Sequence, residues 1–227
     1  MTRLALSNRF VEASYVEQPK DHPIPERSIV VNPGLTPVWV GEDPVRYIPA
    51  FSSTVLRDTR VESGDSVLVF EILAEDNISA IAHEPGWHLF ADLLPGFPRD
   101  TLLYRGPLED LGIVELDQGL ALGSVATGVA PFRLSVNLWF APAGTDCAIH
   151  NEHDFIEIHS QLHGYGRMQK FKERDHATLY EDLRMSPGHT PPVPFCRSVP
   201  GGGFAYPWHQ YRADSDCVWL AVEFHAV

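Results

Sequence analysis

A histidine-rich segment, residues 144–164, holds the residue types best suited to chemistry in this chain. It reads GTDCAIHNEHDFIEIHSQLHG, so it carries four of the chain's 11 histidines together with Glu157. Imidazole nitrogens and carboxylate oxygens are the ligands that borderline and hard divalent metals prefer. One more histidine, His209, follows a proline in the later sequence YPWH. We therefore expect a metal site to which both segments contribute, the alternative being a solvated histidine-rich turn.

The spacing of these residues sets which side chains can face one site. Successive side chains of a β-strand point to opposite faces, so Glu157 and His159 share a face. His150 and His153 are three apart and would face opposite ways on a regular strand. A β-bulge at residues 151–152 would turn both inward. If His150 is not a ligand, His159 is the natural substitute.

The same spacing resembles the first motif of the cupin family. A glycine is followed after five residues by a histidine, and a second histidine is followed after three residues by a glutamate and after six more by a glycine. The chain departs from the family by one extra residue between the two histidines. YPWH resembles the proline-then-histidine element of the second motif, without its usual glycine. The resemblance covers roughly residues 130–227 and rests on Gly144, His150, His153, Glu157, Gly164 and His209.

The resemblance implies a ligand set and a cofactor. His150, His153, Glu157 and His209 would hold a divalent metal, for which we expect Fe(II), with Zn, Mn or Ni as alternatives. Facing strands of one barrel would bring His209 to the first cluster. We expect His159 or Tyr206 to move a proton during the reaction.

The elements that must position these residues are predicted to be short strands. The chain has 19 prolines and 17 glycines, which interrupt it too often for long helices. Apolar residues alternate with Ser135, Asn137 and Trp139 over residues 134–140, as in a strand. Residues 204–210 and 217–225 are predicted to form a last hairpin. The predicted class is all-β: a cupin-type double-stranded β-helix, or jelly-roll barrel, with an N-terminal β-rich extension.

Three regions are expected along the chain. Prolines are closely set within residues 1–37, which we interpret as an extended N-terminal arm with one edge strand at residues 28–31. Residues 38–130 form a β-rich N-terminal part, either a degenerate cupin half or an extension of the sheet. Residues 131–227 form the metal-binding cupin barrel. Because cupins commonly pair through such arms, we expect a homodimer.

Composition limits the partners. The formal net charge of −13 argues against nucleic acid and anionic membrane surfaces as partners. No apolar run is long enough for a membrane helix, and no signal peptide is evident. The three cysteines are not spaced as a disulfide framework, so we expect a cytoplasmic protein acting on a small-molecule substrate.

The first functional hypothesis is a non-haem iron oxygenase of the dioxygenase type, acting on a small organic molecule. Three histidines and one carboxylate would leave open positions on a six-coordinate metal for substrate and dioxygen. The second is a non-redox isomerase, cyclase or lyase that abstracts a proton next to a carbonyl, with Glu157 as the base. The third is a cupin that binds a small molecule without catalysis.

Overall fold

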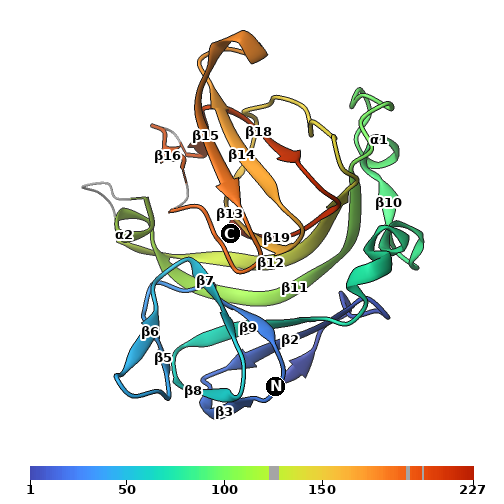
Figure 1. Ribbon diagram of the computed structural model, residues 1–227. Helices are drawn as coiled ribbons and strands as arrows, with labels where there is room; N and C mark the ends of the chain where they lie inside the picture. The colour runs from blue at the N-terminus through green and yellow to red at the C-terminus, as the bar shows by residue number, and fades with distance from the viewer. Residues whose placement is uncertain (123–127, 193–194, 201) are drawn as a thin grey trace.

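The computed structural model describes residues 1–122, 128–192, 195–200 and 202–227. Within them the chain is built mainly of β-strands, and four larger sheets lie in layers over one another (Figure 1). The first two layers come from the N-terminal half, and the last two form a barrel. Three apolar cores fill the spaces between successive layers.

The N-terminal half is a sandwich of two sheets. The outer sheet has the order β3 (Lys20–Ile24), β8 (Thr59–Ser63), β5 (Val38–Val40) and β6 (Arg46–Ile48). The inner sheet has the order β1 (Thr2–Arg3), β2 (Val11–Glu17), β9 (Ser66–Ile72), β4 (Ser28–Asn32) and β7 (Ser52–Leu56). The core between them consists mostly of β-branched residues, which suit a pleated surface: Val16, Val30, Val40, Val61 and Val69.

The structure corrects the expected N-terminal arm. Strands β2 and β4 flank β9 in the inner sheet, so most of residues 1–37 is bound within its own chain. Strand β4 is buried along its whole length, pairs on both sides, and is not an edge strand. The closely set prolines wrongly indicated an extended arm. Pro23 in fact lies in β3, an edge strand, where a missing N–H is tolerated. The homodimer stays a prediction, without the arm to support it, and so do the expected domain boundaries.

The barrel confirms the predicted jelly-roll fold. One wall has the order β10 (His88–Leu89), β11 (Tyr104–Asp117), β12 (Val129–Ala141), β19 (Cys217–Ala226) and β13 (Phe155–His163). The other wall has the order β15 (Leu179–Met185), β14 (Gly166–Phe171) and β18 (Trp208–Ala213). Bridges from Asp146 and His150 to β18 extend this second wall. The chain thus crosses repeatedly between the walls, as in a jelly roll.

The expected hairpin of the last two strands is wrong. Strand β18 pairs with β14, whereas β19 pairs with β12 and β13 on the other wall. The reason is that β19 is apolar on one face throughout and is buried nearly end to end, so it takes a central place against the N-terminal half. As a result, His209 on β18 and Glu223 on β19 lie on different walls of the same barrel.

The wall formed by β10, β11, β12, β19 and β13 has two different faces. Even-numbered residues of β12, such as Leu134, Val136 and Leu138, pack in the core against the N-terminal sheet. Odd-numbered residues face the barrel interior, as the alternation of a strand requires. Trp139 and Trp219 are register partners on this inner face, and so are Glu157 and Glu223. The side chains that could take part in chemistry therefore lie on the inner face of the wall.

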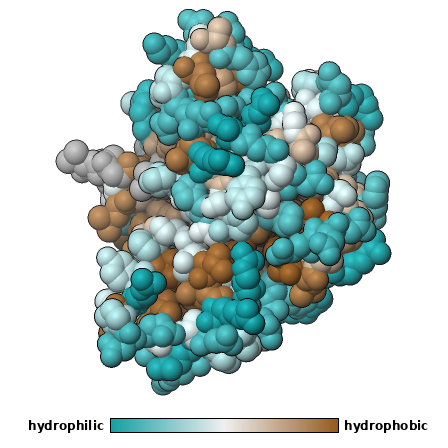
Figure 2. All heavy atoms as spheres, viewed as in Figure 1, coloured by the Kyte–Doolittle hydropathy of each residue, from teal (hydrophilic) through white to brown (hydrophobic). Residues whose placement is uncertain are grey.

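Short elements complete the fold. Helix α1 (Phe90–Leu93) follows β10 beside the barrel, α2 (Gln118–Leu122) follows β11, and β16 (Arg197–Ser198) pairs with β17 (Phe204–Ala205). Two 3-10 segments are η1 (Glu75–His83) and η2 (His176–Thr178). In the view of Figure 2, hydrophilic residues cover most of the barrel, and hydrophobic residues gather lower down, around the N-terminal layers. None of the helices in the described ranges has the length and apolar character needed to cross a bilayer.

Candidate metal centre

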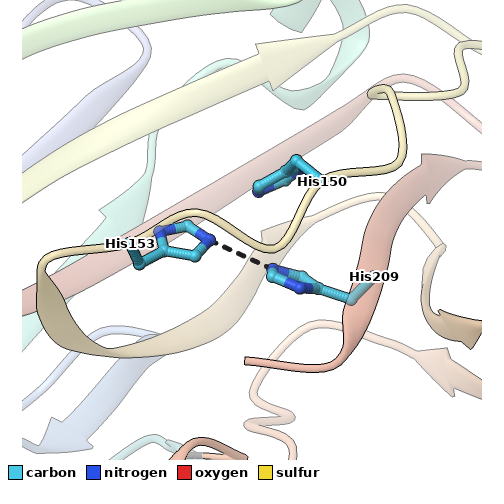
Figure 3. A group of neighbouring side chains, drawn as sticks. All are labelled: His150, His153 and His209. Atoms are coloured by element: carbon cyan, nitrogen blue, oxygen red, sulfur yellow. Dashed lines mark hydrogen bonds between the residues drawn. The ribbon is translucent and has the colours of Figure 1, made fainter. Parts of the chain in front are cut away.

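Three histidines from two segments converge inside the barrel. Figure 3 shows His150 and His153 on the loop before β13 and His209 on β18, with their rings directed toward one another. One ring nitrogen from each lies within 4.8 Å of the other two. Among the described residues, no other group of three potential metal ligands comes together in this way. The structure thus unites three of the four predicted ligands.

Backbone pairing places two of these rings. His150 and His209 donate their N–H groups to each other's carbonyl oxygens, both at 2.9 Å, so their side chains project from the same side of the pair. Ala148 adopts a left-handed conformation (φ 68°) just before this pairing. His153 follows on an irregular loop, because β13 begins only at Phe155. A loop therefore replaces the expected bulge at residues 151–152 and absorbs the extra residue of the motif.

Hydrogen bonds fix the protonation of two rings. The Nδ1 atoms of His150 and His209 lie 2.9 Å from the carbonyl oxygens of Ala148 and Pro207, respectively. Because a carbonyl oxygen only accepts, each Nδ1 carries the proton and each Nε2 is left with a lone pair. A backbone partner on the second ring nitrogen is the usual arrangement of a metal-binding histidine.

His150, His153 and His209, hereafter the trio, suit a divalent cation. The Nε2 atom of His153 is 3.3 Å from the lone-pair Nε2 of His209. Burial, with a further contribution from the neighbouring His150, lowers the pKa of His209 to about 3, and burial also lowers the pKa of His150. Both rings are therefore neutral near pH 7, as metal binding requires. The donor set of three imidazoles with converging nitrogens fits Zn, Fe or Ni.

Glu157 lies beside the trio rather than within it. Its carboxylate oxygens are 2.8 Å from Nε2 of His159 and 3.9 Å from Nδ1 of His153. Burial would raise the pKa of Glu157, but the neighbouring histidines, His159 first, lower it to about 2. The side chain is 7% exposed and is a carboxylate at neutral pH. Its role as a metal ligand stays a prediction.

His159, the predicted substitute for His150, is outside the trio. Its ring stacks on Tyr211 with the centroids 4.2 Å apart. Although Glu157 is close, the approach lies outside hydrogen-bond geometry, and neither ring nitrogen has a hydrogen-bond partner within the described residues. Leaving buried polar atoms unpaired is costly, and such atoms are frequent at functional sites.

Tyr206 is placed differently from the expected proton carrier. Its hydroxyl donates to the carbonyl oxygen of Phe155 at 2.9 Å and accepts from the N–H of Glu157 at 3.0 Å. Burial raises its pKa well above the ordinary value. These contacts fasten the start of β13, which sets the position of Glu157. Its proposed role in proton transfer stays a prediction.

Two histidines of the trio, His150 and His153, line a cavity of about 500 Å³ inside the barrel. His150, His153, Glu157 and His159 line it together with Tyr211. The rest of its lining is mainly apolar: Phe90, Leu94, Phe97, Leu103, Trp139, Phe155 and Trp219. A more open cavity of about 950 Å³ lies among residues 40–59, but neither histidine nor cysteine lines it. The chemistry therefore belongs to the barrel cavity.

A second carboxylate–imidazole pair lines the same cavity. Oε2 of Glu223 is 2.9 Å from Nε2 of His225, and Oε1 accepts a hydrogen bond of 2.6 Å from Asn137. The structure places Glu223 in the interior, 8% exposed, with His225 at the rim.

Sequence reasoning missed two residues of the cavity. Tyr211 and Arg105 both line it, from β18 and β11. No local pattern singles out either residue, because each is isolated from the histidine-rich segment and reaches the cavity only through long-range strand pairing. His83 and His88 are exposed and do not line the cavity.

The known proteins give only distant likenesses. No family model matches the sequence. No curated protein matches it either. Similar solved structures include a Bacillus subtilis oxalate decarboxylase mutant, with 12% identity over 97% of this chain and 70% of that chain and a TM-score of 0.31. A structure of the DMSP lyases RdDddP and RnDddQII has 20% identity over 66% of this chain and 62% of that chain, with a TM-score of 0.36.

A third likeness is to ectoine synthase from P. lautus, with 15% identity over 50% of this chain and 79% of that chain and a TM-score of 0.29. Such low identities and scores carry no conclusion about function. The fold rests on the strand pairing and the site on its own geometry. The strand pairing by itself gives a jelly-roll barrel. Its three grouped histidines lie on the loop before β13 and on β18.

Proposed function

We propose that the protein is a metal-dependent enzyme that removes a proton next to a carbonyl group of a small organic molecule, as a lyase, isomerase or cyclase does. The observation that carries this proposal is the separation of two functions within one cavity. Three histidines form a metal-suited group, while Glu157 pairs with His159 beside it. A proton-transfer pair next to a cation site is the arrangement that such chemistry needs.

His150, His153 and His209 would hold the metal. A divalent ion there acts as a Lewis acid that polarises a carbonyl oxygen. The metal identity is left open by the donor set, since neutral imidazole suits several borderline ions.

His159 is the proposed proton acceptor. With a pKa of about 2, Glu157 is itself a weak base, but it stabilises the imidazolium that forms when His159 takes the proton. The C–H bond of the substrate breaks, its electron pair stays on the substrate, and the proton moves to a ring nitrogen. The proton then returns to another atom in an isomerisation. In an elimination, a group on the next carbon leaves with the electron pair of its bond.

The surroundings of His159 favour this role. Tyr211 lies flat against its ring at an interplanar angle of 12°, which fixes the ring plane. Tyr206 fastens the backbone at Glu157. The mainly apolar lining keeps bulk water from competing for the proton and strengthens the attraction between Glu157 and a charged His159.

The test is proton exchange without oxygen. Metal-free protein is loaded anaerobically with Fe(II), Mn(II), Zn(II) or Ni(II) and incubated in D2O with a panel of small 2-oxo acids and arylacetates. Proton NMR follows the loss of the signal next to the carbonyl, and His83→Ala serves as an exposed control. We expect metal-dependent exchange that His159→Asn abolishes.

Oxygen uptake separates the rival reaction. The iron oxygenase predicted from the resemblance stays a prediction, and it requires oxygen consumption with the Fe(II) form alone. Turnover that consumes oxygen, with no exchange under anaerobic conditions for any metal, would contradict the proposed proton abstraction.

A further inference from the structure

One arginine side chain in the barrel cavity, that of Arg105, lacks the ion-pair partner that the other partly buried arginine and lysine side chains of the described chain have. Arg105 on β11 lines the cavity and is partly buried. Its Nε atom is buried and has no hydrogen-bond partner within the described residues. The other partly buried arginines and lysine of the described chain, Arg167, Lys170 and Arg212, all form ion pairs with carboxylates. An unpaired guanidinium is therefore an exception in this protein.

The absence of a partner is not due to a lack of acids. The chain has 30 acidic residues and a net charge of −13. Two buried glutamates line the same cavity, but the Glu157 carboxylate lies 2.8 Å from Nε2 of His159, and Glu223 is hydrogen-bonded to Asn137 and His225. Burying a charge without a partner costs several kcal/mol, so an unpaired guanidinium in a cavity is expected to meet an anion supplied from outside.

The register aims Arg105 inward. It pairs with Trp139 on β12, which pairs in turn with Trp219 on β19. Directly opposed residues of paired strands point to the same face, and both tryptophans line the cavity. The guanidinium thus lies at one end of a row of aromatic side chains on the inner face of the wall.

We propose that Arg105 binds the carboxylate of a substrate whose apolar body packs on the aromatic lining. The planar fork of a guanidinium matches a carboxylate in two parallel hydrogen bonds. Phe90 packs edge to face on both Phe97 and Trp139 nearby, and the three rings offer apolar surface to the rest of the molecule. The inference rests on the proposed function, for which it names the substrate class: a small monocarboxylate with an aromatic or aliphatic body.

The test compares an anion with its uncharged analogue. Calorimetric titrations with phenylacetate and with 2-phenylethanol are made on the protein as purified and after metal removal with EDTA. The variants are Arg105→Gln and Arg105→Lys. Arg133→Gln is the matched control, because Arg133 is an exposed arginine on β12 that pairs with Asp110.

We expect the wild type to bind phenylacetate about 10-fold or more tightly than the alcohol, in both forms of the protein. Arg105→Gln should lose that preference without weakening binding of the alcohol, Arg105→Lys should keep part of it, and Arg133→Gln should match the wild type. Equal affinity of Arg105→Gln and wild type for phenylacetate would overturn the inference. So would a wild type that binds no phenylacetate.

Metal removal separates this inference from the proposed function. A preference for the anion that survives EDTA and depends on Arg105 supports the inference even if no proton exchange is found. A preference that disappears with EDTA and is indifferent to Arg105 assigns the carboxylate to the metal and overturns the role of Arg105, while the proposed function stands.

Discussion

Two glutamate–histidine pairs lie side by side on the inner face of the barrel. Glu157 and His159 are on β13, and Glu223 and His225 are on β19. The two glutamates are direct register partners, and each approaches its histidine two positions further along. In sequence the pairs are the same pattern, Glu-x-His, and in the fold they share one wall and one cavity.

Their surroundings differ. Glu223 is held by Asn137, and His225 forms a hydrogen bond of 2.9 Å with it while its side chain is 36% exposed. Glu157 lies next to the trio, and both ring nitrogens of His159 are buried without hydrogen-bond partners in the described structure. The pair on β19 has the features of a support, whereas the pair on β13, with its unpartnered ring, is the one to which we assign the proposed proton transfer. Proximity to the metal-suited histidines, not the local pattern, makes the difference.

The largest expected effect is on proton exchange. His159→Asn should lower the metal-dependent exchange rate by about 100-fold or more, because it removes the proposed proton acceptor. His225→Asn should change it by less than about 5-fold, because a residue at the rim only supports the site. Both rates are measured by NMR in D2O. Equal losses in the two variants would erase the distinction between the pairs.

The metal-free protein should lose stability in acid because of His209, a member of the trio. The pKa of His209 is about 3 when folded and 6.5 in the reference state, so between these values the unfolded chain binds a proton that the folded chain does not. Stability of the metal-free protein therefore falls as the pH drops below 6.5, by about 2 kcal/mol at pH 5 from this residue. Urea unfolding at pH 8 and pH 5 should show the loss in the wild type and a smaller one in His209→Gln. An unchanged pH dependence in the variant would contradict this origin.

The supporting pair should matter for stability more than for the metal. Asn137→Leu removes the amide that donates to buried Glu223, which leaves that carboxylate oxygen without this partner. We expect a loss of about 1–3 kcal/mol in unfolding free energy with metal content unchanged. Thermal or urea unfolding gives the first quantity and elemental analysis the second. Loss of metal would place the second pair in the metal site.

Glu157→Gln should have the smallest effect on the metal. If the trio alone holds the ion, the amide should change metal affinity by less than about 10-fold, the lower end expected for a residue that only supports the ligands. A chelator competition titration measures it. A much greater loss would make Glu157 a ligand, as the family resemblance implies.

The sequence predicted the parts of the site that depend on local geometry. Alternation along a strand put Glu157 and His159 on one face, and the spacing from Gly144 to Gly164 marked the loop that carries His150 and His153 and the strand that follows it. It also predicted that His209 would reach this cluster from another strand. These inferences needed only the period of a strand and the order of residues.

The rest depended on long-range pairing. Nothing local shows that β18 and β19 belong to opposite walls, because the partners that decide it are β14, β12 and β13. Arg105 is one arginine among many until its pairing with Trp139 aims it inward. The strands at Val11–Glu17 and Lys20–Ile24 were missed, and the strand at residues 28–31 was placed at an edge, because prolines at an edge strand and in turns were taken as signs of an arm.

The most direct test is the metal content of the trio. Protein made without a histidine tag is analysed for bound metal per chain as wild type, as each of His150→Ala, His153→Ala and His209→Ala, and as the exposed control His83→Ala. We expect close to one divalent ion per chain in the wild type and the control, with a sharp loss in each of the three variants. Full retention in any of the three variants, or no metal uptake by the wild type, would contradict it.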